Sequence, residues 1–189
     1  MYIPLKDSYG VNTPIFIEDL NSEQMKELEF LKESGDIKEF DTDVYYFPRK
    51  TLIGDPILSV HSVIVRKFIT DGDNVYGYIA GLSLENLAGV STQLPRMLTI
   101  VTNKGDKSGI VVVGYSKVIL QRPPVEITKE NVSILQFLDL LSSIDIDVFG
   151  AYENYKLLQF KEKIGVAYDS LKEYCHLYPK ATTVLERVG

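Results

Sequence analysis

The sequence of 189 residues predicts an α+β protein in two parts. Three observations predict it: a helical pattern followed by a ribbon over residues 22–47, three runs of Val, Ile and Leu between residues 97 and 121, and helical spacing of apolar residues from residue 128 onward. The second part is therefore expected to hold a small antiparallel sheet flanked by helices, followed by a helical C-terminus. A hydrophobic content of 45% with 24% charged residues is typical of a soluble globular chain.

The first part, residues 1–54, begins its recognisable pattern near residue 21. Asn21 or Ser22 is placed to cap a helix over residues 22–34, Met25, Leu28 and Leu31 share its inner face, and Gly35 follows its end. Residues 36–47 then alternate around an Asp-Thr-Asp tip, which is typical of a hairpin. A helix followed directly by a two-stranded ribbon indicates a winged helix-turn-helix-like segment, a fold that often places its helix in the DNA major groove.

Charge leaves two interpretations of this first part open. Residues 1–55 hold twelve Asp and Glu against six Lys and Arg, so the whole net charge of −6 lies there. Gln24 and Lys26 near the helix start, with Arg49 and Lys50 after the ribbon, are the candidate DNA contacts. The acidic helix equally suits a protein-interaction module in which a degenerate winged helix no longer binds DNA.

The second part, residues 55–189, is expected to begin after Gly54 with Asp55 as a helix cap and Pro56 in the first turn. A helix over residues 57–68 and a strand over residues 75–79 precede a helix that ends at Gly89. In that helix the inward residues are expected to be Leu82, Leu84, Leu87 and Ala88. The three following strands have short connections, which predicts an antiparallel meander covered on both faces, with "KGDKSG" as its first hairpin tip.

The C-terminal third reads as helices. Thr128 is a candidate cap for the first, and two more are expected around Gly165, with Tyr155 and Leu158 buried. Pro179 is expected to close the second of these, and residues 181–189 to form a last short helix docked on the sheet. Tyrosines and a phenylalanine recur along these helices, and their spacing places most of them in the core. If several share an exposed face instead, they would form a partner-binding surface.

The sequence lacks the residue patterns that several classes of function require. No nucleophile–base pair, phosphate loop or metal-ligand cluster has the required spacing, so neither an enzyme nor a bound cofactor or metal is expected. The single cysteine, Cys175, excludes an internal disulfide, and neither a secretion leader nor an apolar run of about 20 residues for a membrane span is recognisable. A cytoplasmic protein without membrane contact is expected.

Residues 91–96 form a polar elbow between a buried helix and a buried strand. Ser91 and Thr92 can satisfy backbone groups of the turn, and Pro95 prevents continuation of the helix, which would give the elbow an architectural role. Alternatively, Thr92, Gln93 and Arg96 form an exposed polar patch that contacts a partner.

Taken together, "VYGYIAGLSLENLAGVSTQLPRMLTIVTNKG" and "GYSKVILQRPPVEITKENVSILQFLDLL" resemble the AbiEi-type antitoxins of abortive-infection and type IV toxin-antitoxin systems. Those proteins carry a similar Gly-Leu-Ser segment, a Thr-Gln-Leu-Pro elbow and a strand ending in Thr-Asn. "DVYYFPRKTLIGD" is similar to the end of their wing, and the resemblance covers residues 37–145. Residues 13–36 depart from it, being shorter and more acidic.

The resemblance implies a transcriptional regulator with a second activity. Its winged helix would bind the promoter DNA of its own gene and repress it. Its C-terminal part would counter a cognate nucleotidyltransferase-like toxin without requiring a stable complex. No catalytic activity and no cofactor are implied.

Overall fold

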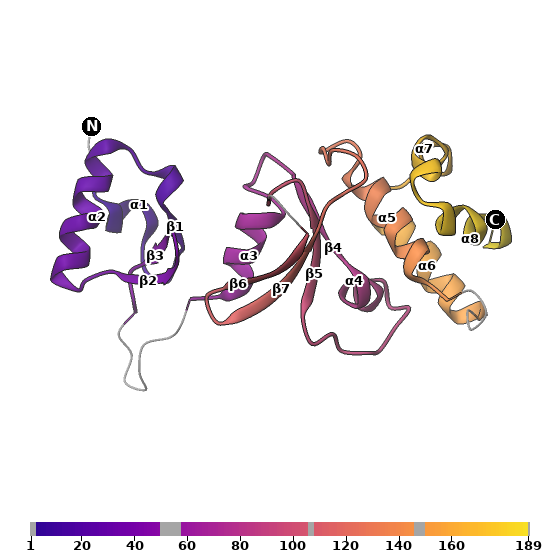
Figure 1. Ribbon diagram of the computed structural model, residues 1–189, viewed down its shortest axis with the longest axis horizontal. Coiled ribbons are helices and arrows are strands. Elements are labelled where there is room, and N and C mark those ends of the chain that lie inside the picture. Colours follow the sequence, from indigo (N-terminus) through magenta and orange to yellow (C-terminus); the bar gives the residue numbers. More distant parts are fainter. Residues whose placement is uncertain (1–2, 50–57, 106–107, 146–149, 189) are drawn as a thin grey trace. The chain divides into compact units, whose positions relative to one another are not determined.

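The computed structural model describes residues 3–49, 58–105, 108–145 and 150–188. It is an α+β fold with two small sheets, as the sequence predicts. The chain divides into two compact units, Met1–Ile64 with Val113–Ser116, and Val65–Val112 with Lys117–Gly189 (Figure 1). The predicted boundary at residue 54 lies outside the described residues and stays a prediction, as do the cap at Asp55 and the turn at Pro56.

The first unit is organised around one well-capped helix. Its elements are α1 (Leu5–Tyr9), β1 (Ile15–Phe16), a 3₁₀ turn (Ile17–Asp19), α2 (Ser22–Ser34), β2 (Lys38–Asp41) and β3 (Val44–Tyr46). Asn21 caps α2 by accepting from the amides of Glu23 and Gln24, and Gly35 ends it in the left-handed region at φ 76°. The predicted helix and both of its ends are confirmed.

A three-stranded antiparallel sheet in the order β1-β3-β2 completes this unit. The predicted ribbon is confirmed as β2 and β3, and Leu28 of α2 packs in one core with Ile15, Ile37 and Tyr45 from the strands and loops. Before α2, however, the only helical segments that the structure describes are a 3₁₀ turn and the five-residue α1. The unit is therefore a winged-helix-like arrangement with a shortened helical part.

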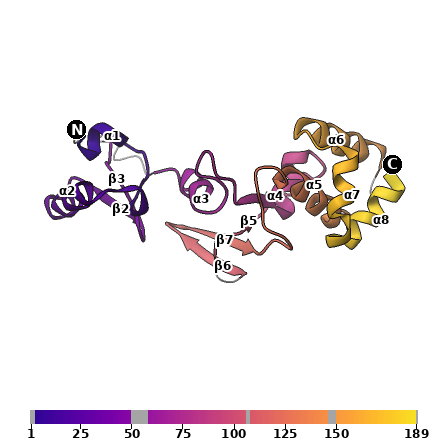
Figure 2. The ribbon, with the colours of Figure 1, turned by 90° about the horizontal axis from the view of Figure 1, so that it is seen from above.

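The second unit contains a four-stranded sheet and a set of helices. Its elements are β4 (Gly77–Ala80), α4 (Gly81–Ala88), β5 (Leu98–Thr102), β6 (Gly109–Val113), β7 (Ser116–Gln121), α5 (Val132–Ser143), α6 (Ala151–Lys163), α7 (Tyr168–Tyr174), a 3₁₀ turn (Cys175–Leu177) and α8 (Pro179–Val188). A further helix, α3 (Val60–Phe68), crosses the division between the units. Figures 1 and 2 show α5 to α8 gathered together beyond β4 and β5.

The strand order in this sheet is β4-β5-β7-β6, so the predicted antiparallel meander is wrong. β4 runs antiparallel to β5, whereas β5 pairs in parallel with β7, Leu98 opposite Val118 and Val101 opposite Gln121. The sheet is thus mixed, and "KGDKSG" joins strands that are not neighbours instead of forming a hairpin tip. The hairpin lies one connection later, between β6 and β7, where Gly114 has a φ of 55°.

Two residues at the end of β5 explain this topology. Thr102 is buried and donates to the carbonyl of Tyr76 at 3.1 Å, which holds it to the chain entering β4. Asn103 bonds both backbone groups of Ile127, donating to its carbonyl at 2.8 Å and accepting from its amide at 2.9 Å. The chain leaving β5 is therefore tied to the chain that has just left β7, as parallel neighbours require.

The core of the second unit lies where α4 to α8 meet β4 and β5. Leu84, Tyr78, Val101, Leu138 and Leu157 belong to one buried cluster.

Within the described part of the chain, no helix combines the length and the apolar character needed to cross a bilayer.

Three expectations for the helices need correction. α6 buries Leu157 and Phe160, whereas Tyr155 and Leu158 are exposed, so the apolar face of α6 lies on other positions than predicted. Pro179 does not close a helix but begins α8, whose main contacts are with α5. Thr128 is not a cap, since α5 begins at Val132.

The exposure of apolar side chains also differs from expectation in α4 and in β6. In α4, Leu84 and Ala88 are buried, but Leu82 and Leu87 are exposed. In β6, an edge strand, Ile110 and Val112 are exposed, so the sheet is not covered on both faces there (Figure 2).

Gly77 gives a direct test of the packing at β4. A Cβ at this position would collide with the carbonyl oxygen of Phe68 and would lie 2.9 Å from that of Val101, and neither backbone atom can rotate away. We expect Gly77→Ala to lower the free energy of unfolding by about 3 kcal/mol, measured by urea denaturation.

The matched control is Gly72→Ala. Gly72 has a φ of 92° but open space around its Cβ position, so only backbone strain is added there. That strain should cost about 1 kcal/mol. A loss at Gly77 no greater than the loss at Gly72 would contradict the packing described for β4.

Candidate functional site

The candidate site is the elbow, residues 90–97, which links α4 to β5. α4 ends at Gly89 in the left-handed region, with its amide donating to Asn86 and that of Val90 donating to Glu85. Within the elbow, the amide of Gln93 donates to Ser91 Oγ at 3.2 Å, and Asn86 Nδ2 donates to the carbonyl of Gln93 at 2.6 Å. The backbone of the elbow is therefore fixed by side chains from its own beginning and from α4.

This geometry bears on the two interpretations of the elbow. Ser91 does satisfy a backbone amide of the turn, as the architectural interpretation expects. Thr92 makes no hydrogen bond with the residues that the structure describes. The anchor that sequence reasoning missed is Asn86, which lies on α4 seven residues before its partner. An Asn in a helix gives no local signal of a bond to a following loop.

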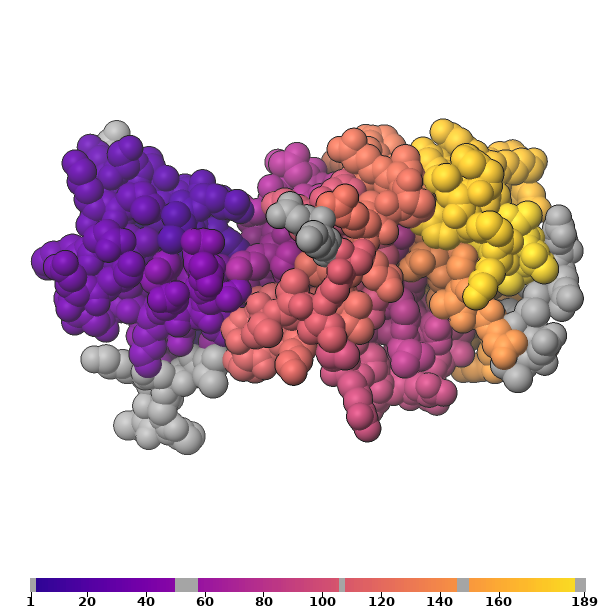
Figure 3. Space-filling model, in the orientation of Figure 1, coloured from indigo at the N-terminus to yellow at the C-terminus, as the bar shows by residue number. Residues whose placement is uncertain are grey.

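The outer side chains of the elbow point away from this framework. Thr92, Gln93 and Arg96 are all exposed, so the three predicted partner contacts lie on one accessible segment. Leu94, which sequence reasoning did not single out, is 87% exposed. Figure 3 shows the segment after α4 protruding from its unit, and its exposed residues combine polar, basic and apolar chemistry.

A basic and aromatic surface of α6 lies next to the end of α4. A Cβ on Gly89 would lie 3.5 Å from Lys156 Cδ, so the Lys156 stem passes over the end of α4. Lys156 Nζ is 5.6 Å from the centre of the Tyr152 ring and 5.9 Å from that of Tyr155, and both rings are more than half exposed. Leu87 lines a shallow cavity of about 230 Å³ with Lys156 and Lys163.

These features form a continuous surface, the α4–α6 surface, defined by Leu87, Tyr152, Tyr155, Lys156 and Lys163. Exposed tyrosines are typical of protein interfaces, and the charge of the two lysines suits an acidic partner. The condition set by the sequence, that several aromatic residues share an exposed helical face, is met by Tyr152 and Tyr155 of α6.

The predicted DNA contacts differ in whether their side chains are accessible. Gln24 is part of the helix cap, because its Oε1 accepts from the amide of Asn21 at 3.1 Å. Lys26 and Arg49 are exposed, and the amide of Arg49 donates to Asn12 Oδ1 at 3.3 Å. Lys50 lies outside the described residues. Lys26 and Arg49 thus have accessible side chains, while Gln24 is engaged in holding α2.

The outer face of α2 has a mixed chemistry. Glu23, Glu29 and Glu33 are exposed there, and Lys32 Nζ pairs with Glu29 at 3.2 Å. The side chain of Phe30 is 68% exposed on the same helix. An exposed aromatic among carboxylates is better suited to a protein surface than to a phosphate backbone.

A buried polar cluster lies inside the second unit, apart from the elbow. The hydroxyls of Tyr78 in β4 and Tyr178 before α8 are 3.3 Å apart. Burial raises the pKa of both hydroxyls, and Asp139 of α5 adds a smaller electrostatic effect in the same direction. Burial also raises the pKa of Asp139 to about 6.

No model of a known protein family matches the chain, and no curated protein is found to be similar to it.

The pKa of Asp139 makes stability depend on pH. Because the pKa is about 6 in the folded protein and 3.8 ordinarily, the folded state binds the proton more tightly, and stability falls as pH rises through that window. The free energy of unfolding is measured for Asp139→Asn and for the parent at each pH. We expect the difference between them to shift in favour of the variant by up to about 3 kcal/mol from pH 4 to pH 7.

If the Asp139→Asn protein keeps the pH dependence of the parent, burial does not raise the pKa of Asp139.

Proposed function

We propose that the protein is an antitoxin-like transcriptional regulator, which represses its own promoter through the first unit and counters a nucleotidyltransferase-like toxin through the second. It would act in the cytoplasm and need no cofactor. The observation that carries the proposal is the order of motifs from Gly77 to Asn103, which resembles AbiEi-type antitoxins. In this chain that order corresponds to β4, α4, the elbow and β5.

Two features of the second unit support the neutralising activity. The elbow has a fixed backbone but exposed Thr92, Gln93 and Arg96, so these side chains are available to a partner. Beside α4 lies the α4–α6 surface, whose tyrosines and lysines suit an acidic protein. The proposed partner surface therefore extends from the elbow onto α6.

The support for repression comes from the order of elements in the first unit and not from its net charge. α2 is followed directly by the ribbon of β2 and β3, which is the order in which winged helices present a helix to the major groove. Lys26 on α2 and Arg49 after β3 offer exposed charges for phosphates. With Gln24 engaged in the cap, these two residues are the proposed DNA contacts among the described positions.

A second candidate function is favoured by the outer face of α2. Glu23, Glu33 and the exposed Phe30 would place negative charge and an apolar ring against the DNA backbone. If that face instead docks on a protein, the first unit is an interaction module that has lost DNA binding. A basic partner with an apolar recess would match this face.

Fluorescence anisotropy distinguishes the two candidates. We expect the full chain to bind DNA from upstream of its own gene more tightly than scrambled DNA, with affinity that falls as salt is added. A single phosphate contact contributes a slope of about one in the logarithmic salt dependence, so Arg49→Ala and Lys26→Ala should each lower the slope by about that amount.

Lys163→Ala on α6 is the matched control, since it removes one exposed lysine from the second unit. Its affinity for the upstream DNA should equal that of the parent chain. Absence of binding at low salt, or equal loss on all three substitutions, would reject repression by the first unit and leave the interaction module.

A further inference from the structure

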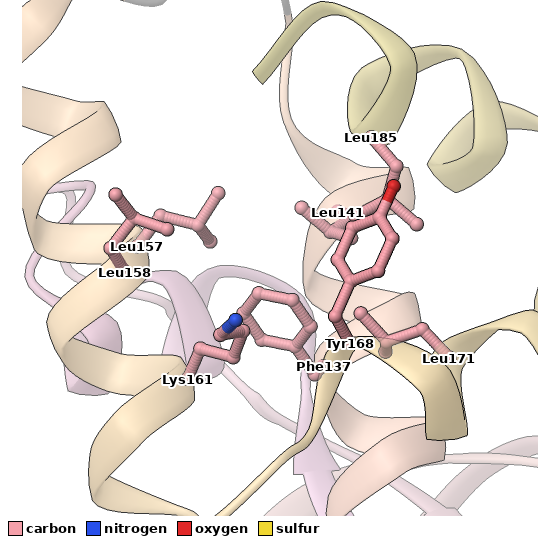
Figure 4. A pocket seen from close by; sticks show the side chains of 8 residues that line it. All are labelled: Phe137, Leu141, Leu157, Leu158, Lys161, Tyr168, Leu171 and Leu185. Carbon is pink, nitrogen blue, oxygen red and sulfur yellow. The ribbon is translucent and has the colours of Figure 1, made fainter. Parts of the chain in front are cut away.

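A pocket lies within the helical part of the second unit, apart from the elbow. Its volume is about 510 Å³, and α5, α6, α7 and α8 each contribute to its wall. Most of the lining is aliphatic or aromatic, with Phe137 and Leu141 from α5, Leu157 from α6, Leu171 from α7 and Leu185 from α8 (Figure 4). Apolar cavities of this size are typical of small-molecule sites.

Lys161 of α6 is the one cationic side chain that lines this pocket. Figure 4 shows Lys161 on the α6 side of the pocket, which it lines together with the almost completely buried Phe137. Lys161 is half-buried. It makes no hydrogen bond or ion pair with the side chains that the structure describes. An ammonium group placed among apolar side chains is stabilised by an opposite charge, because burial removes part of its hydration.

Tyr168 adds a second polar group at the margin of the pocket. Its ring is half exposed, and its hydroxyl has no hydrogen-bond partner among the residues whose side chains are described. Figure 4 shows the ring on the side of the pocket formed by α7, away from Leu157 and Leu158 of α6. The pocket thus offers an apolar interior, one positive charge and one free hydroxyl.

We propose that this pocket binds a small amphipathic carboxylate, of the class of a medium-chain fatty acid. The apolar chain would lie among Phe137, Leu141 and Leu171, and the carboxylate would pair with Lys161. Charge complementarity selects an anion over a neutral apolar molecule, and the walls from four helices favour a compact ligand over a protein surface. The proposal depends neither on DNA binding nor on toxin neutralisation.

Isothermal titration of the full chain with decanoate tests the proposal, with decanol as the neutral probe of the same chain length. We expect decanoate to bind and to displace the fluorescent anion anilinonaphthalene sulfonate, and decanol to bind at least about tenfold more weakly, as expected for loss of a charge-assisted contact. Lys161→Met should reduce decanoate affinity by about tenfold or more and leave decanol affinity unchanged.

Lys163→Met is the matched control, because Lys163 is an exposed lysine on the same helix and does not line this pocket. It should bind decanoate as the parent does, and thermal unfolding should show that both variants are folded. Absence of decanoate binding at millimolar concentration would overturn the proposal. So would equal binding of decanoate and decanol, or equal decanoate affinity in Lys161→Met and the parent, because the pocket would then be an apolar space without a charge-selective site.

Discussion

The parallel pairing of β5 with β7 is the constraint on which the second unit depends. It is maintained at the end of β5, where Asn103 bonds both backbone groups of Ile127 and Thr102 bonds the carbonyl of Tyr76. With β7 beside β5, β6 can only take the edge of the sheet, and the chain after β7 must pass the end of β5 before α5 begins. Thr102 and Asn103 thus have a structural role in this chain.

The elbow lies at the opposite end of the same strand. Hydrogen bonds from Asn86 and Ser91 fix its backbone. The side chains of Thr92, Gln93 and Arg96 take no part in these bonds. The architectural and the partner-binding interpretations are therefore compatible, since they use different atoms of one segment. The first explains why a polar turn joins a buried helix to a buried strand, and the second is our proposal for what its outer surface does.

Sequence reasoning succeeded where the signal is local. The Asn21 cap, the Gly35 and Gly89 helix ends, the ribbon of β2 and β3 and the exposure of the elbow all depend on neighbouring residues. It failed on strand order, because apolar runs give no information about which strand is a partner, and the decisive bond joins Asn103 to Ile127 across the intervening hairpin. It also misassigned Tyr155, since tyrosine occurs both in cores and on surfaces. Lys161 was missed because only the packing of four helices creates its pocket.

We propose separate activities for the two units, repression for the first and neutralisation for the second. A single strain tests this separation, with a reporter behind the protein's own promoter and an inducible nucleotidyltransferase-like toxin. We expect a Lys26→Ala, Arg49→Ala double variant to lose repression but still rescue growth, and a Gln93→Ala, Arg96→Ala double variant to repress normally but no longer rescue growth. If both activities fall together in either folded variant, or if neither variant changes either activity, the claim is contradicted.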